Sequence, residues 1–286
     1  SIIRESGGSA APNNERGDNV MFTTRLISGI VLVILAILIV GTGGTLLFAV
    51  TAALSLIGMF ELYRVVQIEK KAPGFAGYAA GIFYYILLWF HKEEYIVLMA
   101  IMALMVLMAI YVVTFPHYKT EQVTVAFFGI FYLAVMLSYL YQVRAMADGR
   151  YLVWLIVLSS WGCDTFAYCA GMLFGKHKLT PVLSPKKTVE GAVGGVLGAA
   201  LLGLIFGAVF GGRMEEIVSP AVVCAIACAI AAVISQIGDL AASAIKRNHD
   251  VKDYGHLIPG HGGILDRFDS MIFTAPAIYF ALTFLK

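Results

Sequence analysis

The chain contains 286 residues, of which 60% are hydrophobic and only 13% are charged, and its net charge at pH 7 is +2. Soluble globular domains carry about 25% charged residues, so this composition excludes a water-soluble globule, and the small net charge gives no indication of nucleic-acid binding. The composition therefore predicts an all-α, polytopic integral membrane protein.

The N-terminal 20 residues lack the apolar core of a signal peptide. We interpret residues 1–20 as a disordered tail or an artificial extension, with Met21 as the biological start. Residues 26–60 carry no charge, and the GTGG sequence at 41–44 is expected to divide them into two helices. Because roughly 20 apolar residues span a bilayer, we expect about nine spans. The other seven apolar segments are 72–90, 95–118, 122–143, 151–175, 191–212, 217–238 and 270–285.

The distribution of Lys and Arg predicts the orientation. With the N-terminus inside, 15 of the 20 Lys and Arg residues fall on the cytoplasmic side, as the positive-inside rule requires. Two polar loops, 175–191 and 238–270, are then both cytoplasmic. We predict an N-terminal scaffold of about five helices at 21–150 and a catalytic transmembrane region at 151–286 that carries both loops.

Two acidic residues, Asp164 and Asp239, lie in or next to apolar segments that are predicted to be helices. Asp164 lies within a predicted span, where a carboxylate costs several kcal/mol unless it faces a polar cavity or a partner; the alternative is a hydrogen bond that only stabilises packing. Asp239 is followed at helical spacing by Ser243 and Lys246, so the three share one helical face. An ordinary charge cluster at a helix end is the alternative there.

The stretch IPGHGGILDRFDS at 258–270 combines backbone freedom with ionisable groups. Asp266 and Asp269 are expected in the first turn of the last helix, where the helix dipole favours acids. The glycines would let backbone N–H groups approach an anion, and His261 and Arg267 stand beside them. This density of residue types suggests a site for phosphate and metal.

The other loop contains SPKKTVEG at 184–191. Thr188 is expected to cap the following helix, with Glu190 in its first turn. Lys186, Lys187 and the helix N-terminus together suit a phosphate, although the lysines could equally anchor the protein to anionic lipid. Acids for Mg²⁺ and basic loops for phosphates at one membrane face suggest phosphoryl or nucleotidyl transfer to a lipid.

The stretch SAIKRNHDVKDYGHLIPGHGGILDRFD at 243–269 resembles the signature of the CDP-diacylglycerol synthase (phosphatidate cytidylyltransferase) family, and DTFAY at 164–168 and SPKKTVEG resemble its companion segments. The resemblance implies that CTP and phosphatidate react to give CDP-diacylglycerol and pyrophosphate, with Mg²⁺ as cofactor and room for a second cation. It also implies a homodimer in the bacterial inner (cytoplasmic) membrane, with the site facing the cytoplasm.

The resemblance and the residue chemistry together give each candidate a role. Asp239 and Asp266 are predicted to hold Mg²⁺. The candidate catalytic residues are Asp164, Lys246, Asp253, Arg267 and Asp269. The candidate substrate-binding residues are Ser184, Lys186, Lys187, Glu190, Ser243, Arg247, Lys252, His261, Gly262 and Gly263.

Two alternative functions remain at this stage, and a third is excluded by its missing signature. A CTP-dependent lipid kinase would use similar groups, and an ion-coupled transporter would explain acids inside the membrane but not the glycine-rich, basic loops. A CDP-alcohol phosphotransferase would carry a D-G-x-x-A-R string, which this sequence lacks.

Overall fold

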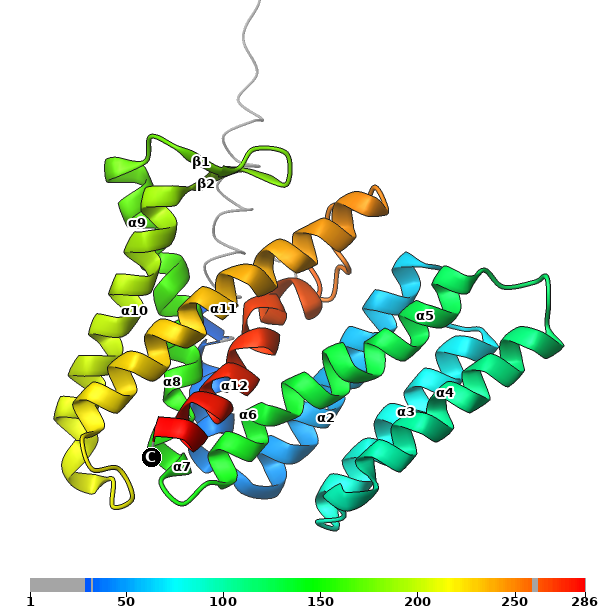
Figure 1. Ribbon diagram of the computed structural model, residues 1–286, viewed down its shortest axis with the longest axis horizontal. Helices are drawn as coiled ribbons and strands as arrows, with labels where there is room; N and C mark the ends of the chain where they lie inside the picture. The colour runs from blue at the N-terminus through cyan, green and yellow to red at the C-terminus, as the bar shows by residue number, and fades with distance from the viewer. Residues whose placement is uncertain (1–28, 32, 259–261, 286) are drawn as a thin grey trace, which may run out of the picture.

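The computed structural model describes residues 29–31, 33–258 and 262–285. The predicted tail at 1–20 and the candidate residue His261 lie outside the described residues. The described chain is almost entirely helical (Figure 1).

Eight helical segments of the described chain are long and apolar enough to cross a membrane, and a shorter apolar helix, Gly29–Thr42, precedes them. The single-helix segments are α2 (Gly44–Val65), α3 (Ala72–Trp89), α11 (Pro220–Asn248) and α12 (Leu265–Leu285). The composite segments are η1 (Glu93–Tyr95) with α4 (Ile96–Val113); α5 (Thr120–Gly129), η2 (Ile130–Val135) and α6 (Met136–Ala145); α7 (Gly149–Leu152), α8 (Trp154–Val157), η3 (Leu158–Gly162) and α9 (Cys163–Phe174); and α10 (Val189–Phe210) with η4 (Gly211–Arg213). The predicted all-α, multi-pass membrane architecture is confirmed.

The predicted break near residue 42 is also confirmed, and its cause is the backbone. Gly43 and Gly44 have φ angles of 65° and 55°, a region that only glycine enters without steric cost. A Cβ atom at Gly43 would come within 2.7 Å of the Arg144 guanidinium carbon. The chain therefore turns here at two glycines that residues with a side chain could not readily replace.

The core of the described chain contains two large groups of buried side chains, together with a small third group formed by Cys163, Ala199 and Ala232. One large group lies among α2, α3, α4 and α5, and the other among α6, α8, α11 and α12. In the first, the hydroxyl of the fully buried Tyr63 donates to the carbonyl of Ala126 at 2.6 Å. The buried hydroxyl of Tyr63 thus has a partner on another helix, which satisfies it without water.

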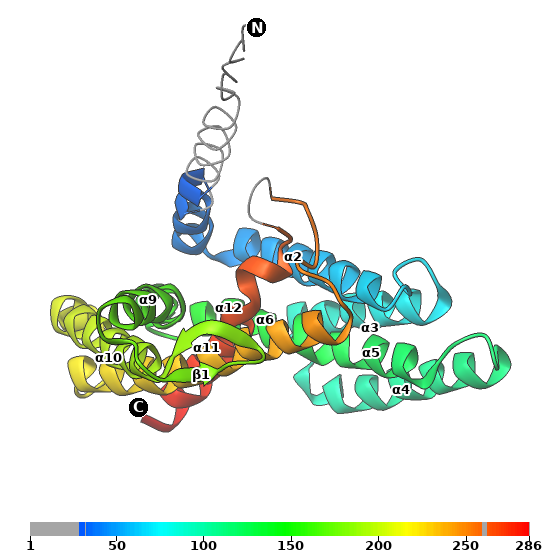
Figure 2. The same cartoon turned by 90° about the horizontal axis from the view of Figure 1, so that it is seen from above.

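Helix α12 connects the two halves of the chain. It packs against α11 and α6 and lies between them in Figure 1. Figure 2 shows α9 and α10 on one side of it and α3, α4 and α5 on the other. The hairpin β1–β2 and the α11–α12 connection lie towards one edge of the bundle, whereas the α10–α11 turn and the C-terminal end of α12 lie towards the opposite edge (Figure 1). The division into a scaffold and a catalytic region at residue 150 stays a prediction.

Two boundaries differ from those expected. Helix α11 runs to Asn248, so the first part of the expected polar loop at 238–270 is helical, in agreement with the helical spacing of Asp239, Ser243 and Lys246. Gly238 is a packing contact within this helix: a Cβ atom there would lie 2.8 Å from the ring of Phe273. The expected loop at 175–191 contains a two-stranded antiparallel sheet, β1 (Lys178–Thr180) and β2 (Ser184–Thr188). The polar segments are therefore more ordered than the sequence suggested.

Candidate active site

Two ion pairs bring the two predicted polar segments together. Lys187 in β2 donates to the carboxylate of Asp239 in α11, and Lys246, two helical turns further along α11, donates to Asp266 in α12 at 2.9 Å. The hairpin and the start of α12 thus both contact the same stretch of α11, residues 239–246. This convergence agrees with the prediction that both segments lie on the same side of the membrane.

Asp266 organises the connection into α12. Its Oδ1 accepts from Lys246, and its Oδ2 accepts the backbone N–H groups of Tyr254 at 2.8 Å and Gly263 at 3.0 Å. The side chain is only 4% exposed. A carboxylate offers about four lone-pair positions, of which these three donors leave one. Asp266 therefore fixes the loop and retains room for one further ligand.

Asp239 belongs to a group of three carboxylates, one from each of three helices. It interacts electrostatically with Asp164 in α9 and with Asp269 in α12, and those two also interact with each other. Like charges this close repel unless cations neutralise them, and Lys187 and Lys246 supply part of that neutralisation. The arrangement attracts cations and excludes apolar ligands.

In the part of the chain that the structure describes, no three His, Cys, Asp or Glu residues converge closely enough to chelate one metal ion. Mg²⁺ commonly takes only one or two carboxylates and completes its shell with water and substrate phosphates. Two carboxylates therefore fit Mg²⁺. Asp239 is 27% exposed and accepts a hydrogen bond from Lys187, and Asp266 has one lone pair without a donor. Their role as Mg²⁺ ligands stays a prediction.

The other candidates surround this centre. Ser243 is half-buried and Arg247 exposed on the last turns of α11, and Lys252 and Asp253 are exposed in the connection that follows. Arg267 is exposed in the first turn of α12. On β2, Ser184 is half-buried and Lys186 is exposed. Gly262 has a φ of 85° and pairs with Ile258 across the connection.

Glu190 is engaged with the hairpin. Its carboxylate accepts from the ring of His177 at 2.6 Å and from the backbone N–H groups of Lys176 and His177. The predicted cap of α10 is confirmed, because the Thr188 hydroxyl accepts the N–H of Gly191. Glu190 thus fastens the hairpin to α10, and its contact with substrate stays a prediction.

Tyr254 packs against the end of α11, next to Lys246. Its buried hydroxyl donates to the carbonyl of Ala242 at 2.9 Å, and the Lys246 ammonium lies 5.4 Å from the ring centroid. Burial raises the pKa of Tyr254 far above its usual range, with smaller contributions from Tyr132 and nearby acids. The hydroxyl therefore stays protonated and keeps its hydrogen bond.

Glu61 contacts the start of α12 but was not among the residues predicted from the sequence. This α2 residue is only 4% exposed, and its carboxylate accepts the N–H of Ile264 at 3.0 Å and of Leu265 at 2.8 Å. A Cβ atom at Gly255 or Gly263 would lie 2.5 Å from its oxygens, so both glycines make room for it. The signal was available: Glu61 follows an uncharged apolar run directly, as unusual a place for an acid as that of Asp164.

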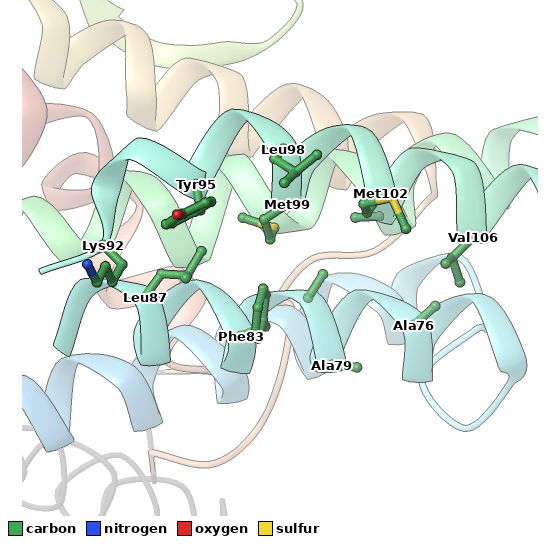
Figure 3. A pocket seen from close by; sticks show the side chains of 12 residues that line it. Ala76, Ala79, Phe83, Leu87, Lys92, Tyr95, Leu98, Met99, Met102 and Val106 are labelled. Carbon is green, nitrogen blue, oxygen red and sulfur yellow. The ribbon is translucent and has the colours of Figure 1, made fainter. Parts of the chain in front are cut away.

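Two apolar grooves lie outside this polar centre. A groove of about 670 Å³ lies between α3 and α4 and is lined mainly by aliphatic, aromatic and methionine side chains (Figure 3). A second, of about 450 Å³, lies among α6, α11 and α12. Neither is lined by a candidate site residue, so the acids are not at the bottom of either groove.

The comparisons with known proteins agree with one family. The sequence model of the cytidylyltransferase family matches residues 23–285. A phosphatidate cytidylyltransferase of Bacillus subtilis (strain 168) is 31% identical over 271 residues, which cover 90% of this chain and 96% of that protein. Phosphatidate cytidylyltransferases of Staphylococcus saprophyticus and Staphylococcus haemolyticus are 32% and 30% identical, each over 89% of this chain and 96% of their own length.

Proposed function

Because the chain belongs to the cytidylyltransferase family, we propose that it transfers the cytidylyl group of CTP to phosphatidate, giving CDP-diacylglycerol and pyrophosphate. The observation that carries this proposal is that two ion pairs, Lys187–Asp239 and Lys246–Asp266, lie two helical turns apart along the end of α11. Acids that suit a metal and cations that suit phosphates are what a reaction between two phosphate-bearing substrates needs.

The reaction does not need a strong general base. The nucleophile is a phosphatidate oxygen that is already anionic near neutral pH; it forms a bond to the α-phosphorus of CTP while the bond from that phosphorus to the α–β bridging oxygen breaks, and pyrophosphate leaves. The obstacle is the mutual repulsion of two polyanions. Lys187 and Lys246 are placed to bind phosphate oxygens and to stabilise the charge that develops on the leaving group.

The two acids would hold Mg²⁺, which when bound neutralises and orients phosphate oxygens. Asp239 would exchange Lys187 for the ion, which would free that ammonium for a phosphate. Asp266 would use its remaining lone pair while Lys246, Tyr254 and Gly263 keep its carboxylate in place. Asp164 and Asp269 would add negative charge that favours a cation at Asp239.

The proposal includes a location. Fifteen of the 20 Lys and Arg residues support an orientation with the site towards the cytoplasm, and the relatives named above are bacterial. We therefore place the protein in the bacterial inner membrane. The homodimer implied by the resemblance stays a prediction.

The test is direct. The purified chain in detergent, given CTP, phosphatidate and Mg²⁺, is expected to release pyrophosphate, and a chelator is expected to stop the release. Label on the cytidine should reach the lipid; transfer of the γ-phosphate alone would indicate a lipid kinase instead. Absence of both labels from the lipid, with a folded protein, would refute the proposal.

A further inference from the structure

Three buried hydroxyl groups border the acids without a hydrogen-bond partner. Among the described residues, four buried side-chain polar atoms lack one, namely the hydroxyls of Tyr132, Ser160, Ser235 and Thr180. Thr180 belongs to the hairpin. Ser235 precedes Asp239 by four residues within α11, which places hydroxyl and acid on the same side of that helix, and Ser160 lies in the π-helical turn η3, four residues before Asp164. Unpaired buried hydroxyls are rare in proteins and call for a ligand or water.

Tyr132 is the best placed of the three. It is 2% exposed and close enough to Asp269 and Asp239 to interact with both electrostatically. Its ring lies 6.0 Å from the ring of Phe273, edge to face. It belongs to η2, a π-helical turn, and such turns frequently occur at functional sites because they redirect a side chain.

The groove among α6, α11 and α12 begins four residues beyond Tyr132 and Asp269, at Met136 and Phe273. Phe273 lines it and also packs against Gly238, the residue before Asp239. On α12, Asp269 is followed by the groove residues Phe273 and Ala277 at steps of four residues, so the acid and the groove share one helical face. On the neighbouring helix, Met136 of the groove follows Tyr132 by four residues.

The groove has the length of one lipid chain. On α12 it runs from Phe273 to Leu285, about 18 Å at about 1.5 Å per residue. This is a little over half of the roughly 30 Å hydrocarbon core, slightly more than the depth of a single leaflet. A groove that starts at acids and cations and descends through one leaflet matches a phospholipid, whose phosphate, esters and chains follow in that order.

We propose that one acyl chain of the lipid substrate occupies the groove among α6, α11 and α12, and that the Tyr132 hydroxyl donates a hydrogen bond to an ester carbonyl of that lipid. The inference rests on the proposed function for the identity of the lipid. The phosphate would lie at Lys187 and Lys246, the esters one turn deeper at Tyr132, and the chain along Ala277 and Phe280.

The larger groove between α3 and α4 does not compete for this role. Its only charged lining residue, Lys92, lies 3.5 Å from Glu94, and the positive-inside count places Lys92 at the opposite face from the acids. A lipid held there would have its phosphate far from the reacting groups. This groove provides a matched control.

The first experiment maps and blocks the chain site. A phosphatidate that carries a diazirine midway along one acyl chain should crosslink to α12 or α6 near Phe280 and Met136, and Ala277→Trp should abolish these crosslinks, with Ala277→Leu intermediate. Ala277→Trp should raise the KM for dioleoyl phosphatidate about tenfold or more but leave the KM for dihexanoyl phosphatidate unchanged. Ala79→Trp, which fills the α3–α4 groove, should change neither.

The second experiment isolates the hydroxyl. Tyr132→Phe should raise the KM for the diester about three- to tenfold and should not affect a diether analogue, in which neither chain has a carbonyl to accept the hydrogen bond. A purely structural role of the hydroxyl would weaken both lipids equally. That outcome would refute the ester contact.

The outcomes separate the two proposals. Crosslinks that map to α3 and α4, or a KM that changes equally for the long and short lipids in Ala277→Trp, would refute the acyl-chain site. A wild-type protein that releases no pyrophosphate with either lipid would refute the proposed reaction. The crosslinking map would still decide the chain site in that case, because it requires no turnover.

Discussion

Glu61 Oε2 accepts the backbone N–H of Leu265 at 2.8 Å, although 204 residues separate them in the chain. Leu265 is the first residue of α12, and its N–H is one of the groups that a helix start leaves without an intrahelical partner. An acid from the second described helix therefore fixes the start of the last one. Asp266 and Asp269 follow within the next five residues.

Replacement of Glu61 should uncouple α12 from α2. Glu61→Gln removes the negative charge and turns one acceptor into a donor that faces N–H groups, which should lower the free energy of unfolding by about 1–3 kcal/mol and reduce turnover at least several-fold. Melting in detergent and pyrophosphate release measure the two effects. Glu94→Gln, an exposed acid paired with Lys92, is the control and should change neither.

The two predicted metal ligands should behave differently. Asp239 is partly exposed and Asp266 is buried with three donors. Asp239→Asn should reduce Mg²⁺-dependent turnover at least about a hundredfold, since each 1.4 kcal/mol changes a rate tenfold, and should leave melting in a chelator nearly unchanged. Near-normal turnover by this variant would contradict its role.

Asp266→Asn should impair both properties. It removes the charge opposite the mostly buried Lys246 ammonium, and an amide cannot accept on both sides. The free energy of unfolding should fall by up to about 3 kcal/mol, and turnover should fall as well. A loss of turnover with unchanged melting would assign Asp266 to the metal alone, and unchanged turnover would exclude it from the site.

The neighbouring lysines Lys186 and Lys187 provide a matched pair. Lys187 reaches Asp239, whereas Lys186 is exposed on the same strand. In neutral-detergent micelles Lys187→Gln should reduce turnover at least tenfold, since it removes a charge-assisted contact worth about 1.5–3 kcal/mol, and Lys186→Gln should have a much smaller effect. If both lose activity only on anionic bilayers, membrane attraction explains both lysines.

The predicted orientation can be tested with single cysteines. Val182 in the hairpin, Leu257 in the α11–α12 connection and Val218 in the α10–α11 turn are all exposed, whereas Tyr254 is buried and unsuitable. In a background without the four native cysteines, cysteine at Val182 or Leu257 should react only with a reagent on the cytoplasmic side. Cysteine at Val218 should react only from outside, and the reverse pattern would invert the topology.

Sequence patterns predicted the features that depend on local chemistry. Uncharged segments located the spans, the GTGG turn followed from backbone sterics, and Thr188 was a recognisable cap. The helical spacing of Asp239, Ser243 and Lys246 also indicated that α11 continues past Gly238. The contact of Gly238 with Phe273, 35 residues later in the chain, was not predictable in this way, because it depends on tertiary packing.

The candidate site was predicted in its residue types but not in its connections. The pairs Lys187–Asp239 and Lys246–Asp266 join residues 52 and 20 positions apart, and no helical spacing relates them. The unusual position of Glu61 in an apolar helix was visible in the sequence, but its partners were not, because they are backbone groups 203 and 204 residues away. Backbone donors leave no signature in side-chain motifs.

The length of α11 has a consequence for where the product forms. Its 29 residues extend about 43 Å at about 1.5 Å per residue, more than the roughly 30 Å hydrocarbon core, even with a tilt of about 20°. Asp239 is about 28 Å from the first residue of the helix on the same scale, near the far boundary of the hydrocarbon, and Lys246 is beyond it. The reacting phosphates would therefore meet in the headgroup layer: the lipid would not have to be extracted from the bilayer, its diacyl product would stay in the leaflet, and pyrophosphate would leave directly into water.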